Sequence, residues 1–254
     1  MPPSVSFPKM ESAAFSGGNR MGTIVDMHVH TIRGASDSSL TPDQLIGEAR
    51  RIGLTGVNIT EHDRAWDDHE WESFRQRAGI FLSRGMEVST DLGHIIVVGL
   101  TRYVPGIRRA KELRRVVDEV GGFMIAAHPF RHFFDPVYYR RDGRRPVELT
   151  PQEAARLPIF ELVDEIEVAN GGCTPQENAF ALMVARILGK KGIGASDCHS
   201  TNGLGCFVTV FEEELESQEH MLSLLRAGKY YPAGGLNVGK LRPFEEMVAH
   251  LLPG

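Results

Sequence analysis

The sequence predicts an α/β fold in which strands and helices alternate and close into a barrel. From residue 23 to about residue 227, apolar segments of strand length alternate with amphipathic segments of helical length. This alternation is typical of parallel strands joined by crossover helices. Seven or eight strand–helix units favour a barrel over an open sheet, and the 254 residues match the roughly 250 that such a barrel needs.

The individual elements follow from local patterns. Thr41-Pro42 combines a helix N-cap with proline at the first helical position, so a helix is predicted from there to about Ile52. Further helices are expected at about residues 70–82, 108–121, 175–189 and 217–227. The predicted strands are Thr23–Met27, Thr55–Thr60, Ser83–Val88, Ile95–Leu100, Phe123–Ala127, Glu165–Ala169, Gly192–Ala195 and Phe207–Phe211.

Composition limits the class of protein and its location. Residues 1–22 are rich in Pro, Ser and Gly and are predicted to form a flexible extension to one domain, residues 23–254. This extension lacks the basic and apolar regions of a secretory signal, and the chain has no apolar run of about 18 residues that would span a membrane. Three cysteines without C-x-x-C spacing fit a reducing cytoplasm. The net charge of -5 gives no reason to expect a long nucleic acid as partner.

The first predicted strand ends in Asp26-Met27-His28-Val29-His30. Because side chains alternate along a strand, His28 and His30 point to the same side, where both imidazoles can reach one cation. A half-buried strand without a metal is the simpler alternative for an isolated H-x-H pair. Asp26 shares this face and is predicted to hold the tautomer of a histidine.

Histidines and carboxylates also mark the ends or starts of the other predicted strands. Stability alone does not require histidine at the same edge of successive strands. Mixed imidazole and carboxylate donors suit manganese, zinc or iron better than magnesium or calcium. Since one hydrolytic zinc uses about three protein ligands, this larger set predicts two to three divalent ions, which suit phosphoester cleavage. The residues are Glu61, His62, Asp63, Glu87, His94, His128, Glu167, Asn170, Asp197 and His199.

The ordered segments VDMHVHT, SDSSLTPDQL, TEHD, GMEV, GHIIVVGL, AAHPFR, EVAN and SDCH resemble the polymerase and histidinol phosphatase (PHP) superfamily. The resemblance runs from about Asp26 to His199, and GLGCFVTVF with the following helix resembles the C-terminal part of stand-alone phosphoesterases of this family. It implies a distorted, seven-unit (β/α) TIM-like barrel and a trinuclear metal centre.

The resemblance also implies which residues hold each ion. Asp37 lies in a loop and is alternatively placed to cap the helix that begins at Thr41-Pro42. The chain departs from the common family pattern at Glu61, where aspartate is frequent, and at Ser38, where glycine is frequent. Neither departure removes a ligand. The implied sets are His28, His30, Glu87 and Asp197 for one ion, Glu87, His94 and His128 for a second, and Asp37, His62 and His199 for a third.

Several further residues are candidates for substrate binding and catalysis. Arg131 follows His128-Pro129-Phe130, where its guanidinium is placed to bind phosphate and neutralise charge, with a surface salt bridge as the alternative. Arg33 and His132 are additional substrate-binding candidates. The proton for the leaving group is expected from metal-bound water or from an acid, Glu61 or Asp63.

An Arg-rich insertion on the active-site side is predicted at about residues 131–160. Within it, Arg140-Arg141 and Arg144-Arg145 flank Asp142-Gly143, a turn signal. A solvated turn is favoured over a nucleotide-binding lid.

The predicted function is that of a metal-dependent phosphoric ester hydrolase. Its substrate is expected to be a phosphomonoester of a small metabolite or nucleotide, attacked by a metal-activated hydroxide. The alternatives are a phosphodiesterase or 5′–3′ exonuclease on short oligonucleotides, hydrolysis of a carbon–nitrogen bond, and a metal-binding module without catalysis. No feature of the sequence indicates an oligomeric state.

Overall fold

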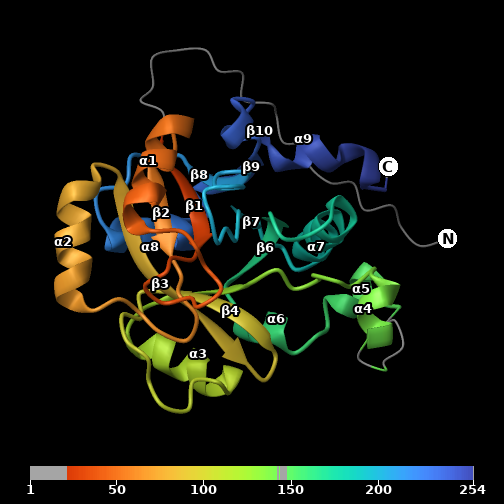
Figure 1. Cartoon of the computed structure of the whole chain (residues 1–254). Coiled ribbons are helices and arrows are strands. Elements are labelled where there is room, and N and C mark those ends of the chain that lie inside the picture. Colours follow the sequence, from red (N-terminus) through yellow and green to blue (C-terminus); the bar gives the residue numbers. More distant parts are fainter. Residues whose placement is uncertain (1–21, 142, 144–147, 254) are drawn as a thin grey trace.

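The computed structural model describes residues 22–141, 143 and 148–253. The predicted extension, apart from Gly22, lies outside the described residues, as do Asp142, Arg144 and Arg145 of the predicted turn. Within the described residues, helices surround one curled sheet (Figure 1).

The first three strands are parallel, as predicted, and are joined by two helices. The Thr41 side chain accepts a hydrogen bond from Gln44 N, and the Gln44 side chain returns one to Thr41 N. This capping box confirms the predicted helix start and leaves no capping role for Asp37. The elements are β1 (Ile24–Val29), α1 (Pro42–Ile52), β2 (Gly56–Ile59), α2 (Asp68–Ala78) and β3 (Phe81–Thr90).

The next strand runs antiparallel to both of the strands that it pairs with, so the prediction of parallel pairing is wrong here. Strand β4 (Gly93–Val98) follows β3 through a tight turn after Thr90, and α3 (Ala110–Glu119) leads to β5 (Phe123–Ala126). A parallel crossover needs about a dozen residues or more, which the turn lacks. As a result, His94 at the start of β4 lies at the same edge as the ends of the parallel strands.

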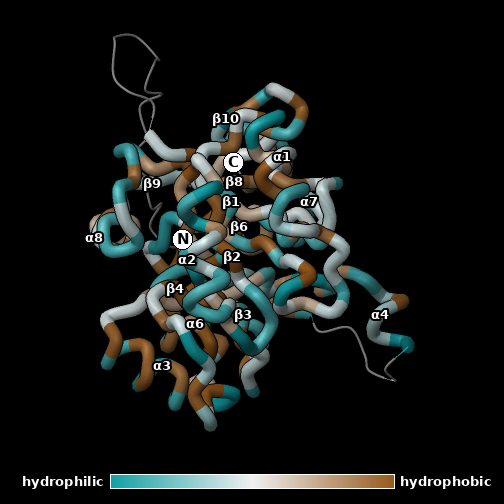
Figure 2. The backbone as a smooth tube through the Cα atoms, turned by 60° about the vertical axis from the view of Figure 1, so that its left-hand side comes forward, coloured by the Kyte–Doolittle hydropathy of each residue, from teal (hydrophilic) through white to brown (hydrophobic). Residues whose placement is uncertain are grey.

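Parallel pairing resumes from β5 through β6 (Glu165–Asn170) to β7 (Ile193–Ala195), with α7 (Pro175–Ile187) as the last crossover. The predicted insertion between β5 and β6 carries three short helices. One of them, α4, lies at the periphery of the molecule (Figures 1 and 2). These helices are α4 (Pro136–Arg141), α5 (Pro151–Ala154) and α6 (Ile159–Leu162).

The C-terminal strands extend the sheet beyond β1 in antiparallel fashion, giving the order β10-β9-β8-β1-β2-β3-β4-β5-β6-β7. The sequence predicted β8 and the following helix but not the elements after them, since Pro232 and Gly234-Gly235 weaken the strand signal. The elements are β8 (Phe207–Phe211), α8 (Gln218–Ala227), β9 (Tyr230–Gly234), β10 (Arg242–Pro243), α9 (Phe244–Val248) and the 3₁₀ turns Leu236–Val238 and Ala249–Leu251.

The β7 end of the curled sheet closes onto β8 and β1 through side-chain hydrogen bonds and one isolated bridge. Thr209 Oγ1 donates to Gly194 O at 2.9 Å and accepts from Gly194 N at 3.1 Å, which joins β8 to β7. A parallel bridge links Val29 to Cys198. The predicted α/β class is therefore confirmed. In the described part of the chain the sheet is mixed and contains ten strands, so the seven-unit barrel stays a prediction.

Strands in the middle of the fold are buried on both faces. Every residue of β1, β2, β5 and β6 is buried, whereas α3 alternates apolar and polar positions and packs one face inward (Figure 2). Polar side chains on such strands, among them histidines and carboxylates, need partners inside the protein. No helix among the described residues is both long enough and apolar enough to cross a membrane.

Candidate metal centre

The side chains that the sequence predicted as ligands converge at one edge of the sheet. They come from the carboxyl ends of β1, β2, β5 and β7, the start of β4, the interior of β3 and the loop between β1 and α1. Strand β3 extends beyond β2, and an isolated bridge between His62 and Glu87 brings the Glu87 carboxylate level with the other strand ends. Every predicted ligand is within 4 Å of at least one other: His28, His30, Asp37, His62, Glu87, His94, His128, Asp197 and His199.

Four of these side chains form a buried cage. His28 Nε2 lies 3.4 Å from Glu87 Oε2 and 3.4 Å from Asp197 Oδ1, and His30 Nε2 lies 3.3 Å from each of the same oxygens. Donors around a tetrahedral ion with bonds of about 2.0–2.1 Å are about 3.3 Å apart. These separations fit an ion at the centre of the cage.

Three of the four atoms that face this cage lack hydrogen bonds. His28 Nε2, His30 Nε2 and Glu87 Oε2 are buried without a hydrogen-bond partner among the described residues. Leaving a buried polar atom unsatisfied costs about 1–3 kcal/mol. A cation at this position satisfies all of them, so the residues present fit a divalent metal.

A second group shares Glu87. Its other carboxylate oxygen, Oε1, lies 2.8 Å from His94 Nδ1 and 3.0 Å from His128 Nε2. These are hydrogen-bond lengths, so an ion between the three atoms requires them to separate by roughly 0.3–0.5 Å. The second group is therefore less preformed than the cage.

A third group lies on the solvent side of the cage. Asp37 Oδ2 lies 3.4 Å from His62 Nε2 and 3.5 Å from His199 Nε2. The His30 ring stacks between the rings of His62 and His199, with centroids 4.2 and 4.3 Å away. The structure thus brings together all three sets that the resemblance implies.

Two of the proposed ligands have a left-handed backbone. The φ angles of His128 and Asp197 are 29° and 54°, a region that residues other than glycine rarely adopt. Such a conformation costs about 1–3 kcal/mol and persists where the surroundings impose it, often at functional sites. Asp197 contributes to the cage and His128 to the second group, so both of these positions carry proposed ligands.

Glu167 holds His28 in place, a role that the sequence analysis gave to Asp26. Glu167 Oε1 accepts a hydrogen bond from His28 Nδ1 at 2.8 Å, while Oε2 accepts from His128 N at 2.7 Å and from Asn170 Nδ2 at 2.9 Å. With its proton on Nδ1, His28 presents Nε2 to the cage. The signal for this role was a carboxylate within the buried strand EIEVAN, which needs an internal partner.

The prediction for Asp26 is wrong, because the Asp26 carboxylate is bound by backbone N–H groups, while the His28 ring pairs with Glu167. Asp26 accepts hydrogen bonds from Ser196 N at 2.9 Å, from Gly205 N at 3.0 Å and from His28 N at 3.4 Å. Burial raises the pKa of Asp26 to about 6 despite these bonds. Asp26 therefore ties the segment after β7 to β1.

The carboxylates of the cage are held in their ionised form. Burial opposes ionisation of Asp197, but His28, His30 and Arg131 nearby keep the pKa of this carboxyl well below its usual value. Burial likewise opposes ionisation of Glu87, and the surrounding histidines outweigh it and lower its pKa. Ionised carboxylates are the form that binds a cation.

Arg131 lies against the cage, as predicted, and not in a surface salt bridge. Its guanidinium pairs with the Asp197 carboxylate and donates to Asn170 Oδ1 at 2.8 Å. Gly172 leaves room for it, since a Cβ there would lie 2.4 Å from Arg131 Nη2. About a quarter of the Arg131 side chain, 26%, is exposed, so it can also meet a ligand from solvent.

Glu61 and Asp63, the predicted acids, are occupied by structural partners. The buried Glu61 carboxylate accepts hydrogen bonds from Thr31 N at 3.1 Å, from Thr31 Oγ1 and from Trp66 Nε1 at 2.8 Å. Asp63 accepts from Ser89 N at 3.1 Å and pairs with Arg108 at 2.6 Å. These contacts support roles in loop structure for both.

The two remaining predicted substrate residues have contacts outside the cluster. Arg33 is half-exposed and lies 3.3 Å from Glu70 on the surface. The His132 ring stacks on Tyr138 of α4, with centroids 4.4 Å apart and planes at 15°. The structure does not bring either of them to the cage.

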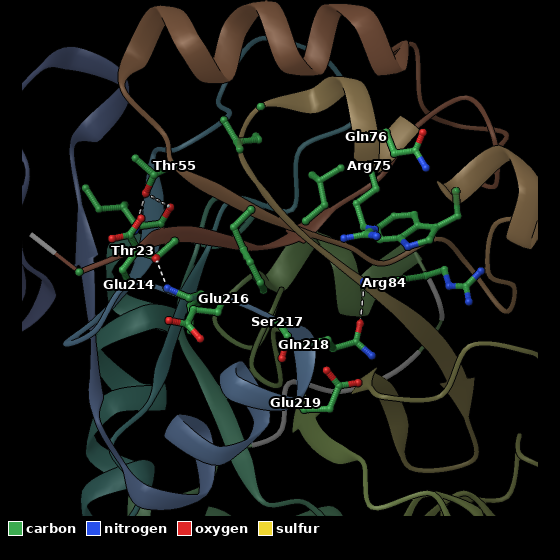
Figure 3. A pocket seen from close by; sticks show the side chains of 18 of the residues that line it. Thr23, Thr55, Arg75, Gln76, Arg84, Glu214, Glu216, Ser217, Gln218 and Glu219 are labelled. Atoms are coloured by element: carbon green, nitrogen blue, oxygen red, sulfur yellow. Dashed lines mark hydrogen bonds between the residues drawn. The ribbon is translucent and has the colours of Figure 1, made fainter. Parts of the chain in front are cut away.

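A cavity of about 1170 Å³ lies elsewhere, at the opposite ends of the first strands. Thr23 and Thr55, which line it, precede β1 and β2. Its basic side chains Arg75 and Arg84 come from α2 and β3, and acidic side chains come from the β8–α8 connection and α8 (Figure 3). None of the predicted ligands lines this cavity. The candidate functional site is therefore the histidine–carboxylate cluster and not this cavity.

Comparison with known proteins finds a family model that matches part of the chain. A family model described as PHP-associated matches residues 175–230. An uncharacterized protein of Methanocaldococcus jannaschii is 27% identical over 114 residues, which cover 41% of this chain and 67% of that protein. The PHP-associated match includes the segment GLGCFVTVF and the helix after it.

Solved structures share the fold. A protein of Bifidobacterium adolescentis, provisionally described as a metal-dependent phosphoesterase, has a TM-score of 0.55 at 19% identity, covering 79% of this chain and 95% of that one. PsfC of Pseudomonas syringae has a TM-score of 0.56 at 16% identity, covering 91% and 99%. An amidohydrolase of Chromobacterium violaceum, with bound sulfate and no metal, has a TM-score of 0.52 at 18% identity, covering 79% and 96%.

The fold and the site together define an α/β protein with a histidine–carboxylate cluster suited to divalent metals at the carboxyl edge of its sheet. Together with the ordered motifs, the PHP-associated match at residues 175–230 supports a protein of the PHP superfamily.

Proposed function

We propose that this protein is a metal-dependent phosphoesterase that hydrolyses a phosphomonoester of a small metabolite or nucleotide. The observation that carries the proposal is the cage around Glu87 Oε2 and Asp197 Oδ1, where buried imidazole nitrogens converge without hydrogen bonds. The two further groups beside it supply donors for more than one ion.

Three sets of residues would hold the ions, with manganese, zinc or iron as the metals that suit these donors. Glu87 would contribute one oxygen to each of two sets, because Oε2 faces His28 and His30 while Oε1 faces His94 and His128. When bound, divalent ions supply Lewis-acid charge that lowers the pKa of water and offsets the charge of phosphoryl oxygens.

Arg131 gives the site its preference for phosphate. The planar guanidinium can donate two parallel hydrogen bonds to phosphoryl oxygens, a geometry that an ammonium group cannot match. Its contacts with Asp197 and Asn170 fix its position at the rim of the cage. The substrate phosphate would therefore lie between Arg131 and the metal-binding residues.

The leaving group would take its proton from water and not from a carboxylic acid of the chain. Glu61, with three donors on its carboxylate, and Asp63, paired with Arg108, are both engaged by other groups. Neither is assigned as the general acid in this proposal.

Hydrolysis of a carbon–nitrogen bond is the second candidate, favoured by the likeness of fold to the amidohydrolase of Chromobacterium violaceum. Both reactions would use the cage. The guanidinium beside Asp197 distinguishes them, because it suits a phosphate dianion better than a neutral amide.

A screen of substrates on the manganese-loaded protein tests the proposal. We expect hydrolysis of p-nitrophenyl phosphate and of phosphorylated metabolites, with at least a roughly 100-fold loss in His28→Ala and Asp197→Ala. Full activity in those variants would refute the mechanism. Faster cleavage of 5′-phosphorylated oligonucleotides would indicate an exonuclease, cleavage of amides the second candidate, and no cleavage at all a metal-binding module.

A further inference from the structure

The loop that carries Asp37 is fastened to two strand ends by one hydroxyl group. Ser38 Oγ lies 2.9 Å from His30 O, after β1, and 3.1 Å from His199 O, after β7. The same oxygen accepts a hydrogen bond from Leu40 N at 3.2 Å. Ser38 thus connects the backbones of two proposed ligands that are far apart in the sequence.

Other contacts fix the two sides of this loop. Ser39 N donates to His199 O at 2.8 Å, and Ile32 N donates to Leu40 O at 3.0 Å, which closes the loop at its base. On the other side, Thr31 N donates to Glu61 Oε2 at 3.1 Å. Ser39 Oγ also lies 3.2 Å from His199 O, so Ser38 and Ser39 together hold the part of the loop next to Asp37, and the Ser38 hydroxyl in addition reaches His30 O.

The Asp37 side chain makes few contacts with the described part of the chain. Its side chain is 61% exposed, and within the described part of the chain its carboxylate makes no hydrogen bond. Its contacts are those with His62 and His199, at 3.4 and 3.5 Å. The position of this carboxylate therefore depends on the backbone of the adjacent Ser38.

We propose that Ser38 is a positioning residue for the ion held by Asp37, His62 and His199. Its hydroxyl keeps the Asp37 backbone and the His199 carbonyl together, so that the third group is assembled before an ion binds. It acts through Asp37 and touches neither metal nor substrate. The inference rests on the metal binding of the proposed function and not on the reaction that follows.

The test compares two serine-to-alanine changes in one loop. Ser38→Ala removes the hydroxyl, whereas Ser36→Ala makes the same change at an exposed residue outside these hydrogen bonds. Asp37→Asn removes the carboxylate charge. Metal-free full-length variants are titrated with Mn²⁺ by calorimetry, bound metal is counted by elemental analysis, and melting temperatures without metal report on folding.

We expect the wild type and Ser36→Ala to bind three ions, and Asp37→Asn to bind two tightly. In Ser38→Ala, affinity for the ion that Asp37→Asn loses should fall by about 10–100-fold, the usual effect of losing an orienting partner. Affinity for the other two should stay within about twofold. The double variant should match Asp37→Asn, because Ser38 acts through Asp37.

Three results would overturn the inference: Ser38→Ala binding like Ser36→Ala, equal weakening of all ions with a lower metal-free melting temperature, or fewer than three ions in the wild type. No substrate is present in these measurements. A protein that shows the expected binding but cleaves no phosphoester would keep the role of Ser38 and remove the proposed function. An active phosphoesterase in which Ser38→Ala leaves metal affinity unchanged would keep the proposed function and remove the role of Ser38.

Discussion

His28 and Glu167 form a buried pair in which the imidazole Nδ1 and a carboxylate oxygen lie 2.8 Å apart. Both side chains are fully excluded from solvent, and the other Glu167 oxygen accepts from the backbone of His128. One carboxylate therefore orients a ligand of the cage and fixes the backbone of a ligand from the second group. The stability of the metal centre depends on it.

Replacing Glu167 with glutamine tests this dependence. The glutamine amide keeps the size of the Glu167 side chain, but it places an NH₂ group against one of the N–H groups that now donate to the carboxylate. We expect metal affinity to fall by about 10–100-fold, measured by competition with a chromogenic chelator. Glu161→Gln, an exposed change on α6, is the control. Equal affinities in the two variants would contradict the role of Glu167.

Glu61→Gln separates a structural carboxylate from a catalytic acid. The change leaves one of its donors, Thr31 N–H or Trp66 Nε1–H, facing an amide NH₂, so unfolding free energy in urea should fall by about 1–3 kcal/mol. Turnover at saturating metal should stay within a few-fold of the wild type. A lost limb in the pH–rate profile, with metal content intact, would instead make Glu61 the acid.

Arg131→Lys probes recognition of phosphate. Lysine keeps the charge beside Asp197 but cannot form the paired hydrogen bonds of a guanidinium. We expect kcat/KM for p-nitrophenyl phosphate to fall by about 10–100-fold, corresponding to roughly 1.5–3 kcal/mol. Inhibition by inorganic phosphate should weaken in parallel. Arg33→Lys, at the surface beside Glu70, should change neither value by more than about twofold, and an equal loss there would show that the effect is not specific to Arg131.

Removal of metal should lower thermal stability. Ions that bind only the folded state stabilise it by about 2.7 kcal/mol per site at 100 times the dissociation constant. At about 2–4 °C per kcal/mol for a chain of this size, a chelator should reduce the melting temperature by at least about 5 °C. Differential scanning calorimetry checks this. An unchanged melting temperature in a protein shown to release metal would argue against a centre built into the fold.

The buried Asp26 carboxyl should make stability depend on pH in a defined direction. Its pKa, raised by burial from 3.8 to about 6, means that the folded state binds the proton more tightly than the unfolded chain. Between about pH 4 and 6 the folded state therefore loses stability as pH rises, by on the order of 3 kcal/mol.

Urea unfolding of the metal-free protein beside Asp26→Asn isolates this effect from the other acids. The asparagine variant loses a hydrogen bond to Gly205 or Ser196 at every pH and should be less stable at pH 4. The advantage of the wild type should narrow as pH rises to 6. A constant difference across this range would show that Asp26 titrates normally.

The sequence by itself determined the residue types at the strand ends and the start of α1. Thr41-Pro42 predicted a helix because capping depends on residues within one turn. Histidines and carboxylates at successive strand ends predicted a metal site. When strands alternate with helices along the chain, the carboxyl ends of the strands lie at one edge of the sheet. The ligand sets followed from the ordered family motifs, and the structure brings the same residues together.

Only the tertiary structure decided which groups partner one another. The antiparallel turn after Thr90 reverses the direction of β4. His94, near the start of β4, therefore lies at the same sheet edge as the ends of the parallel strands. Glu167, not Asp26, holds His28, and these two residues are 139 positions apart in the chain. Glu61 turned out to be occupied by Thr31 and Trp66. Local sequence patterns do not predict such contacts, because hydrogen bonds between distant segments depend on how the strands pair and on how deeply each residue is buried.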